Sequence, residues 1–174
     1  MLNTNEKFLI TILSTGGTIE KTYDEIAGSL ENRDSIIQEH VVSKLRLPYT
    51  ELAIHTIMSK DSLYMTDDDR QMIAQQISTH AQHGYPIIVL HGTDTMVKTL
   101  EHCTKTLTAI RVPVIFTGAM KPQEFQDSDA LQNVTEALIA AKLLKPGFYL
   151  SFHNRIFSST QVRKNTRKAT FEAC

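Results

Sequence analysis

Short runs of apolar residues alternate along the chain with longer stretches in which apolar residues recur every three or four positions. Three of the runs are nearly continuous, at residues 8–15, 85–91 and 112–117, which is typical of strands buried on both faces. A further strand is predicted at residues 51–58. Strands that alternate with helices favour a three-layer α/β/α fold around a mainly parallel sheet.

Helical spacing of apolar residues predicts helices within residues 35–45, 66–84, 96–107 and 128–144. Thr66 precedes three aspartates and is expected to cap its helix, because a hydroxyl and acidic residues suit a helix N-terminus. Ser35-Ile-Ile-Gln38 has the form of a capping box. The residues predicted to face the core are Met72, Ile73, Ile77, Ala81, Met96, Val97, Leu100, Cys103, Leu107, Leu131, Val134, Leu138 and Leu143.

Three segments have weaker patterns. Residues 18–33 have little periodicity and are predicted to form a long loop, a class of segment that often acts as a lid or binding loop. Residues 148–152 and 155–158 are predicted to form a hairpin around His153-Asn154. Residues 160–174 are polar and basic without a clear period, so no element is predicted there.

Composition indicates an ordinary globular protein. Of the 174 residues, 41% are apolar and 21% are charged, and the net charge is −1. Without a long basic run, a nucleic-acid or membrane partner is not expected. The two cysteines lie far apart, so neither a disulfide framework nor a zinc site is expected. The start resembles no signal peptide, and no linker divides the chain, so we expect one cytoplasmic domain over residues 1–174.

Two glycine turns, Thr15-Gly-Gly-Thr18 and Gly92-Thr-Asp-Thr95, follow predicted strands. The carboxyl edge of a parallel sheet is where open α/β folds bind ligands. Neither turn fits the dinucleotide fingerprint or a P-loop. From the residues alone, a structural role for Thr18, Thr93 and Asp94 as turn and cap residues weighs equally with a catalytic one. His91 is expected to be structural, and Asp67-Asp-Asp69 to be a helix start and not a metal site.

The motifs change this balance. Ser14-Thr-Gly-Gly-Thr-Ile19 and Leu90-His-Gly-Thr-Asp-Thr-Met96 resemble the two signature segments of the bacterial-type L-asparaginase family, which hydrolyses the side-chain amide of asparagine. Asp61-Ser-Leu-Tyr-Met-Thr66 is similar to that family's substrate-binding segment. Thr117-Gly-Ala-Met120 is similar to its Gly-Ala-Met turn, and Val162-Arg-Lys-Asn165 to the segment with its catalytic lysine. The match runs in order from about residue 8 to residue 172, and it implies a Rossmann/flavodoxin-like domain.

The resemblance implies a role for individual residues. Thr18 corresponds to the nucleophile, and Thr93, Asp94 and Lys164 correspond to a second catalytic group. Tyr23 stands where the family keeps a mobile tyrosine that helps to activate the first threonine. The implied substrate-binding residues, with Ser62 and Asp94 at the charged ends of the substrate, are Gly17, Asp61, Ser62, Thr93, Asp94 and Ala119. No cofactor and no metal are implied.

The chain also departs from the family. Most members are about twice as long and have a C-terminal domain that completes the active site of a neighbouring subunit. We therefore predict a short enzyme that consists of the catalytic domain alone, and a homo-oligomer, most simply a dimer. Leu63 stands where some members have a polar residue that contacts the substrate carboxylate. Two alternatives stay open: L-glutamine or another small amide as the substrate, and a non-catalytic amino-acid-binding module.

Overall fold

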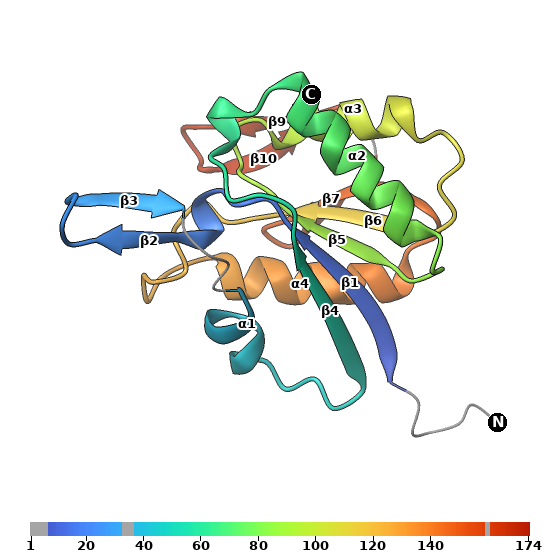
Figure 1. Ribbon diagram of the computed structural model, residues 1–174, viewed down its shortest axis with the longest axis horizontal. Helices are drawn as coiled ribbons and strands as arrows, with labels where there is room; N and C mark the ends of the chain where they lie inside the picture. Colours follow the sequence, from blue (N-terminus) through green and yellow to red (C-terminus); the bar gives the residue numbers. More distant parts are fainter. Residues whose placement is uncertain (1–6, 33–36, 159–160) are drawn as a thin grey trace.

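A six-stranded sheet forms the centre of the part of the chain that the computed structural model describes, residues 7–32, 37–158 and 161–174 (Figure 1). In spatial order its strands are β4 (Thr50–Thr56), β1 (Phe8–Ser14), β5 (Ile87–Leu90), β6 (Pro113–Thr117), β7 (Gly147–Phe152) and β8 (Arg155–Phe157). The first five are parallel, and β8 returns antiparallel to β7 as the second half of the predicted hairpin. The predicted mainly parallel sheet is confirmed.

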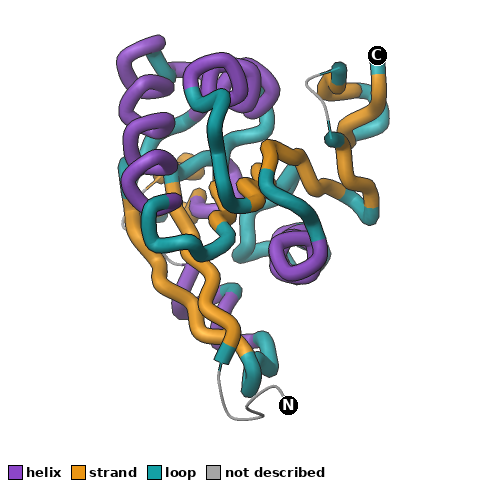
Figure 2. The backbone as a smooth tube through the Cα atoms, turned by 90° about the vertical axis from the view of Figure 1, so that its right-hand side faces the viewer, coloured by secondary structure: helices purple, strands orange, loops and turns teal. Residues whose placement is uncertain are grey.

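Helices cover both faces of this sheet, as Figure 2 shows with helices in purple and strands in orange. One face carries α2 (Asp67–Ala81) and α3 (Met96–Thr106), which bury Ile73, Leu100 and Cys103 against the strands. The other face carries α4 (Ala130–Leu143) and the short α1 (Ile37–His40) with the 3-10 turn η2 (Val42–Lys44). The fold is therefore the predicted three-layer α/β/α arrangement. No helix within the described ranges is long and apolar enough to span a membrane.

The cap of α2 is as predicted, but two predicted core positions are wrong. Thr66 Oγ1 accepts a hydrogen bond from Asp69 N (3.2 Å), and the Asp69 side chain accepts one from Thr66 N (2.7 Å). Met72 is 46% exposed and Leu143 is 76% exposed. The inward faces of α2 and α4 run through small residues such as Ala74 and Ala137, and this spacing leaves Met72 and Leu143 off the buried side.

The helix predicted at residues 35–45 is present only in part. The described residues form α1 and η2, separated at Val41, which has φ −110° and ψ −63°. Ser35 and Ile36, and with them the start of the predicted capping box, lie outside the described residues. Ile37 and Val41 are buried under α4's face of the sheet, so the predicted apolar side of this segment does face the core.

Two hairpins were not predicted. Instead of a long loop, residues 18–32 form the 3-10 turn η1 (Thr18–Glu20) and the pair β2 (Lys21–Asp24) and β3 (Ser29–Asn32), which extends away from the sheet in Figure 1. Residues 162–173 form β9 (Val162–Asn165) and β10 (Thr170–Ala173). Apolar and polar residues alternate along the sequence of a strand only where one of its faces is buried. The β2–β3 pair is mostly exposed, and β9–β10 buries only Val162 and Phe171.

Candidate active site

Four turns meet at the carboxyl edge of the sheet, because parallel strands end on the same side. They follow β1, β5 and β6, and the fourth leads from β4 into the 3-10 turn η3 (Ser62–Tyr64). Close approach of glycine backbones brings them into contact. A methyl group on Gly17 would lie 2.4 Å from Gly92 Cα, and one on Gly92 would lie 2.6 Å from Ser62 Oγ. Glycine at both positions therefore lets the Thr18 turn, the Thr93 turn and η3 pack together.

Gly17→Ala is expected to lower the free energy of unfolding by roughly 3 kcal/mol or more. The substitution adds a methyl group where there is no space, at a φ of +85° that L residues rarely adopt. Gly84→Ala is the matched control, since Gly84 has φ +78° but no atom within 4 Å of the added carbon. Urea denaturation of both variants measures the difference. Equal losses of stability in the two variants would show that the contact with Gly92 contributes nothing.

Lys164 links the second turn to the C-terminal hairpin. Its Nζ donates hydrogen bonds to Thr93 Oγ1 (2.7 Å) and to Asp94 Oδ1 (2.7 Å). Thr93 is buried, whereas the side chains of Lys164 and Asp94 are 21% and 39% exposed. A cation, a hydroxyl and a carboxylate thus meet at the surface of the sheet edge. Such a group can orient a threonine oxygen and can hold an ammonium group of a ligand.

Thr18 begins η1, directly after Gly17, and is half-buried. No side-chain hydrogen bond of its hydroxyl is formed with any residue in the described ranges. The buried carboxylate of Glu20 stabilises this turn by accepting hydrogen bonds from Gly16 N (3.0 Å) and from the Ser14 hydroxyl. Glu20 therefore holds the turn, and within the described residues the Thr18 hydroxyl makes no side-chain hydrogen bond. Glu20 was not predicted as a site residue, because the burial of its carboxylate becomes apparent only in the folded structure.

The η3 turn adds Asp61 and Ser62. Asp61 accepts from Leu63 N (3.0 Å) and pairs with Lys21 Nζ at 2.6 Å. Burial raises the pKa of the Asp61 carboxyl, but the hydrogen bonds from Lys21 and Leu63 N, with the charges of Lys21 and Lys164, lower it more, so the net pKa lies below the ordinary 3.8. Ser62 is fully buried, and its Oγ accepts from Thr95 N at 3.4 Å. The Ser62 hydroxyl therefore faces the Thr93 turn and not solvent.

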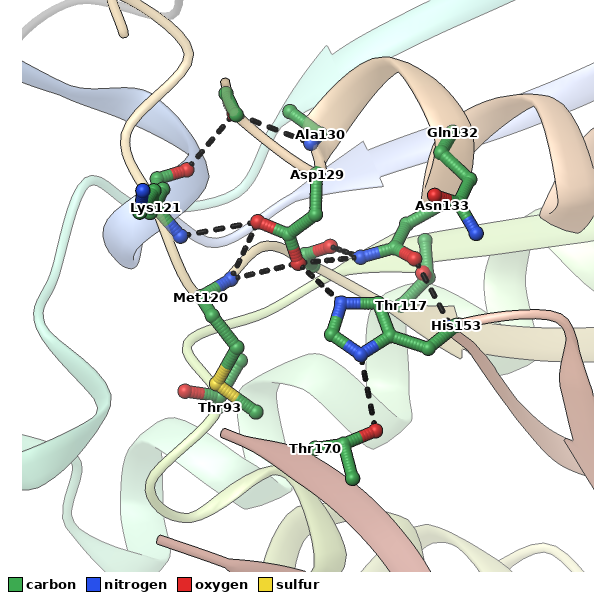
Figure 3. Close-up of polar contacts among 12 residues, drawn as sticks. Thr93, Thr117, Met120, Lys121, Asp129, Ala130, Gln132, Asn133, His153 and Thr170 are labelled. Carbon is green, nitrogen blue, oxygen red and sulfur yellow. Dashed lines mark hydrogen bonds and ion pairs between the residues drawn. The ribbon is translucent and has the colours of Figure 1, made fainter. Parts of the chain in front are cut away.

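A partly buried network, drawn in Figure 3, supports the turn at residues 118–120. This turn contains Ala119. The Asp129 carboxylate accepts hydrogen bonds from Met120 N (3.0 Å), Lys121 N (3.0 Å) and Asn133 Nδ2 (2.9 Å), and it contacts His153 Nε2 at 2.9 Å. Burial raises the pKa of Asp129, but the two backbone N–H groups and the His153 ring lower it more, so the net pKa lies below 3.8. Sequence analysis selected none of these residues for the site.

His91, for which a structural role is predicted, lies in the interior of the fold. It is fully buried, and burial lowers its pKa to about 4, so the ring is neutral near pH 7. Its Nδ1 lies 2.8 Å from Gly92 O, and a neutral ring with the hydrogen on Nδ1 donates to that carbonyl. Asp67, Asp68 and Asp69 form the first turn of α2, where Asp69 caps the helix and pairs with Lys60 Nζ at 2.6 Å. Among the described residues there is no group of three or more histidine, cysteine or acidic side chains placed to hold a metal ion.

Comparison with known proteins identifies the family to which these motifs belong. The sequence matches the family described as "Asparaginase, N-terminal" over residues 9–173. The chain belongs to the asparaginase family. L-asparaginase 1 of Escherichia coli strain K12 is 31% identical over 165 residues, which cover 91% of this chain and 48% of that protein. The solved structure of the thermostable L-asparaginase from Thermococcus kodakarensis superposes with a TM-score of 0.79 at 27% identity, covering 95% of this chain and 51% of that one.

Similarity to this asparaginase-family domain extends to proteins with other names. The 60 kDa lysophospholipase of Mus musculus is 30% identical over 132 residues, which cover 75% of this chain and 23% of that protein. The chain spans about half the length of the L-asparaginases that it matches. Family membership therefore identifies the domain, and the activity of this chain is a separate proposal.

Within this asparaginase-family domain, the structure brings most of the selected residues together. Gly17, Ser62, Thr93, Asp94 and Lys164 are linked by the contacts given above. Tyr23 is different: it lies on β2 and is 57% exposed, and its hydroxyl forms no hydrogen bond with any residue of ranges 7–32, 37–158 and 161–174. The hairpin that carries Tyr23 is attached to the domain through Tyr23 N, which donates to Glu124 Oε2 at 2.9 Å, and through Lys21 of β2, which pairs with Asp61.

Because of Asp129, the stability of the fold is expected to decrease as the pH is lowered. Because its folded pKa lies below the unfolded value near 3.8, ionised Asp129 stabilises the fold above that value. This stabilisation is lost as the pH falls from about 5 through the folded pKa. Melting temperatures between about pH 6 and pH 3 should therefore fall more steeply for the wild type than for Asp129→Asn. Parallel curves for the two proteins would contradict this assignment.

Proposed function

We propose that this protein is an amidohydrolase that converts L-asparagine to L-aspartate and ammonia, with Thr18 as the nucleophile. The observation that carries the proposal is the pair of 2.7 Å hydrogen bonds from Lys164 Nζ to Thr93 and Asp94, beside the Gly17–Gly92 contact that brings the Thr18 turn to the same edge. Membership of the asparaginase family supports it. Assembly into a homo-oligomer and a cytoplasmic location stay predictions from the sequence.

In the first step of the proposed reaction, Thr18 Oγ1 forms a bond to the amide carbon and the C–N bond breaks. The hydroxyl proton of Thr18 passes to the departing nitrogen, so ammonia leaves and an aspartyl ester of Thr18 remains. Backbone N–H groups near Gly17 or Thr93 would stabilise the oxyanion that forms on the way. The Thr18 hydroxyl suits this role, because among the described residues no side-chain hydrogen bond of this hydroxyl has to be broken before attack.

In the second step, water adds to the ester carbonyl, aspartate leaves, and the proton returns to Thr18 Oγ1. We assign Thr93 to this step. Lys164 Nζ donates to Thr93 Oγ1, which leaves the hydroxyl hydrogen of Thr93 available to the reacting oxygen. Asp94 also contributes to substrate binding, because its partly exposed carboxylate would pair with the α-ammonium group of the substrate.

The decisive experiment measures ammonia release from L-asparagine, L-glutamine and a small panel of other amides by the purified chain. Asparagine as the substrate with the highest kcat/KM supports the proposal. Preference for glutamine or another amide supports the alternative, which the exposed Leu63 beside Ser62 favours because it offers no hydrogen bond to a substrate carboxylate. Binding of aspartate without ammonia release from any amide would instead identify a binding module.

A further inference from the structure

The hairpin that carries Lys164 has few attachments to the domain. Among the strands of the described residues, β9 and β10 pair with each other and not with the six-stranded sheet. Val162 and Phe171 anchor the hairpin in the core, with the Phe171 ring 5.0 Å from that of Phe152. An isolated two-stranded hairpin is marginally stable in water, so the position of Lys164 depends on each contact that this hairpin makes.

One of these contacts comes from His153. The ring of His153 lies between two groups: Nε2 is 2.9 Å from Asp129 Oδ2, and Nδ1 is 2.9 Å from Thr170 Oγ1 (Figure 3). Thr170 is on β10, opposite Asn165, the residue that follows Lys164 on β9. The ring therefore joins the Asp129 network, which holds the turn at residues 118–120, to the strand pair that holds the lysine.

The loop that carries His153 fixes the position of its ring. His153 and Asn154 form the two-residue loop between β7 and β8, with φ values of 46° and 61°. Such loops favour asparagine and glycine, since other residues are less stable at positive φ. His153 is further fixed by its N–H, which donates to Asn133 Oδ1 at 3.1 Å, and Asn133 Nδ2 donates to Gly118 O at 2.9 Å.

The link between His153 and Thr170 does not depend on which ring atoms carry hydrogens. Nε2–H donates to the Asp129 carboxylate. If Nδ1 lacks a hydrogen, it accepts from the Thr170 hydroxyl, and if Nδ1 is protonated, it donates to the same oxygen. A threonine hydroxyl can do either, so the connection persists in both states of the ring.

We infer that His153 is a positioning residue for Lys164: through Thr170 it fixes the β9–β10 hairpin against Asp129 and keeps Nζ within reach of Thr93 and Asp94. The effect of this positioning on catalysis rests on the proposed function, whereas the positioning of Lys164 itself does not. The other reading is that the network contributes only to the overall stability of the fold, in which case Lys164 would stay in place without it.

The test compares His153→Phe, which keeps a ring but removes both nitrogens, with Thr170→Val and with the double variant. Each purified protein is treated briefly with succinimidyl acetate, and acetylation of Lys164 is measured by mass spectrometry relative to the exposed Lys98 and Lys105. Each single substitution is expected to speed acetylation of Lys164 about fivefold, the factor for one lost hydrogen bond. The double variant should show no further increase, because both changes break the same link.

Matched controls separate this effect from general loosening. Thr170→Ser keeps the hydroxyl and is expected to retain wild-type acetylation of Lys164. Thr135→Val, at an exposed site of α4, and His102→Phe, at a partly exposed site of α3, make the same replacements away from the hairpin and should also leave it unchanged. Unchanged acetylation in His153→Phe, with only a lower melting temperature, would overturn the inference. Additive effects in the double variant would exclude the route through Thr170.

Ammonia release by the same proteins distinguishes the two proposals. If the proposed function holds, His153→Phe and Thr170→Val should each lower kcat for asparagine about fivefold while KM changes less. If the wild type releases no ammonia, the proposed function fails, while the acetylation result still tests the positioning of Lys164. A kcat that stays at the wild-type value although Lys164 is acetylated faster would show that this positioning has no role in the reaction.

Discussion

Lys164→Met is expected to lower kcat for L-asparagine by about 10²- to 10⁴-fold, the usual range for loss of a group that directs proton transfer. Methionine has nearly the same length and volume but cannot donate the 2.7 Å hydrogen bonds to Thr93 and Asp94. Without them Thr93 loses its orientation, and Asp94 loses its cation. Steady-state ammonia release over a range of asparagine concentrations measures the change.

Lys168→Met is the matched control for this variant, because Lys168 lies on the same hairpin with an exposed side chain that pairs with Glu172. It should keep at least about half of the wild-type kcat, since an exposed pair of this kind contributes little. Melting temperatures of both variants show whether the hairpin stays folded. Full activity in a folded Lys164→Met protein would remove the lysine from the proposed mechanism.

Thr18→Ala is expected to reduce kcat at least about 10³-fold, because no ester can form without the nucleophilic hydroxyl. The fold should be unaffected, since the Thr18 hydroxyl has no hydrogen-bond partner in the described chain and Gly17 and Glu20 hold the turn. Thr79→Ala, at an exposed site on α2, serves as the control and should behave like the wild type.

Trapping the intermediate separates Thr18 from Thr93. In Thr93→Ala, slow hydrolysis of the ester should let one aspartyl group accumulate on the peptide that contains Thr18, which mass spectrometry of acid-quenched protein detects. If the aspartyl group is instead found on the peptide that contains Thr93 in the Thr18→Ala protein, Thr93 is the nucleophile and Thr18 takes the role assigned to Thr93. Rapid ammonia release by Thr18→Ala would contradict the assignment of Thr18 altogether.

The elements found from the sequence are those whose pattern depends on near neighbours in the chain. β1, β5 and β6 are buried on both faces, so their apolar runs are unbroken. Thr66 and Asp69 form a capping box within four residues, and it is present as predicted. The predictions for Met72 and Leu143 are wrong because the pattern gives a large apolar residue more weight than the alanines that define the buried faces of α2 and α4.

The site residues likewise fall into two groups: those that local sequence patterns indicate and those that only folding brings together. The glycine turns are local, and they offer Thr18, Thr93 and Asp94 as candidates without any knowledge of the tertiary structure. Ser62 was selected through the family resemblance of the segment at residues 61–66. Lys164 was selected through family resemblance alone, since a basic segment without a period carries no sign of where it folds. Asp129 and His153 were missed because they are 24 residues apart, and their hydrogen bond exists only after α4 and β7 have packed.

The layered α/β fold, the sheet edge that holds the candidate site and the residue types available there can be predicted from the amino-acid pattern, because apolar periodicity and glycine turns act over a few residues. Packing of the layers is needed to bring Lys164 to Thr93 and Asp94, to bury Ser62 and leave Tyr23 exposed, and to connect the last hairpin to Asp129 through His153. These contacts join residues that are far apart in the chain, and their distances follow from how the layers pack.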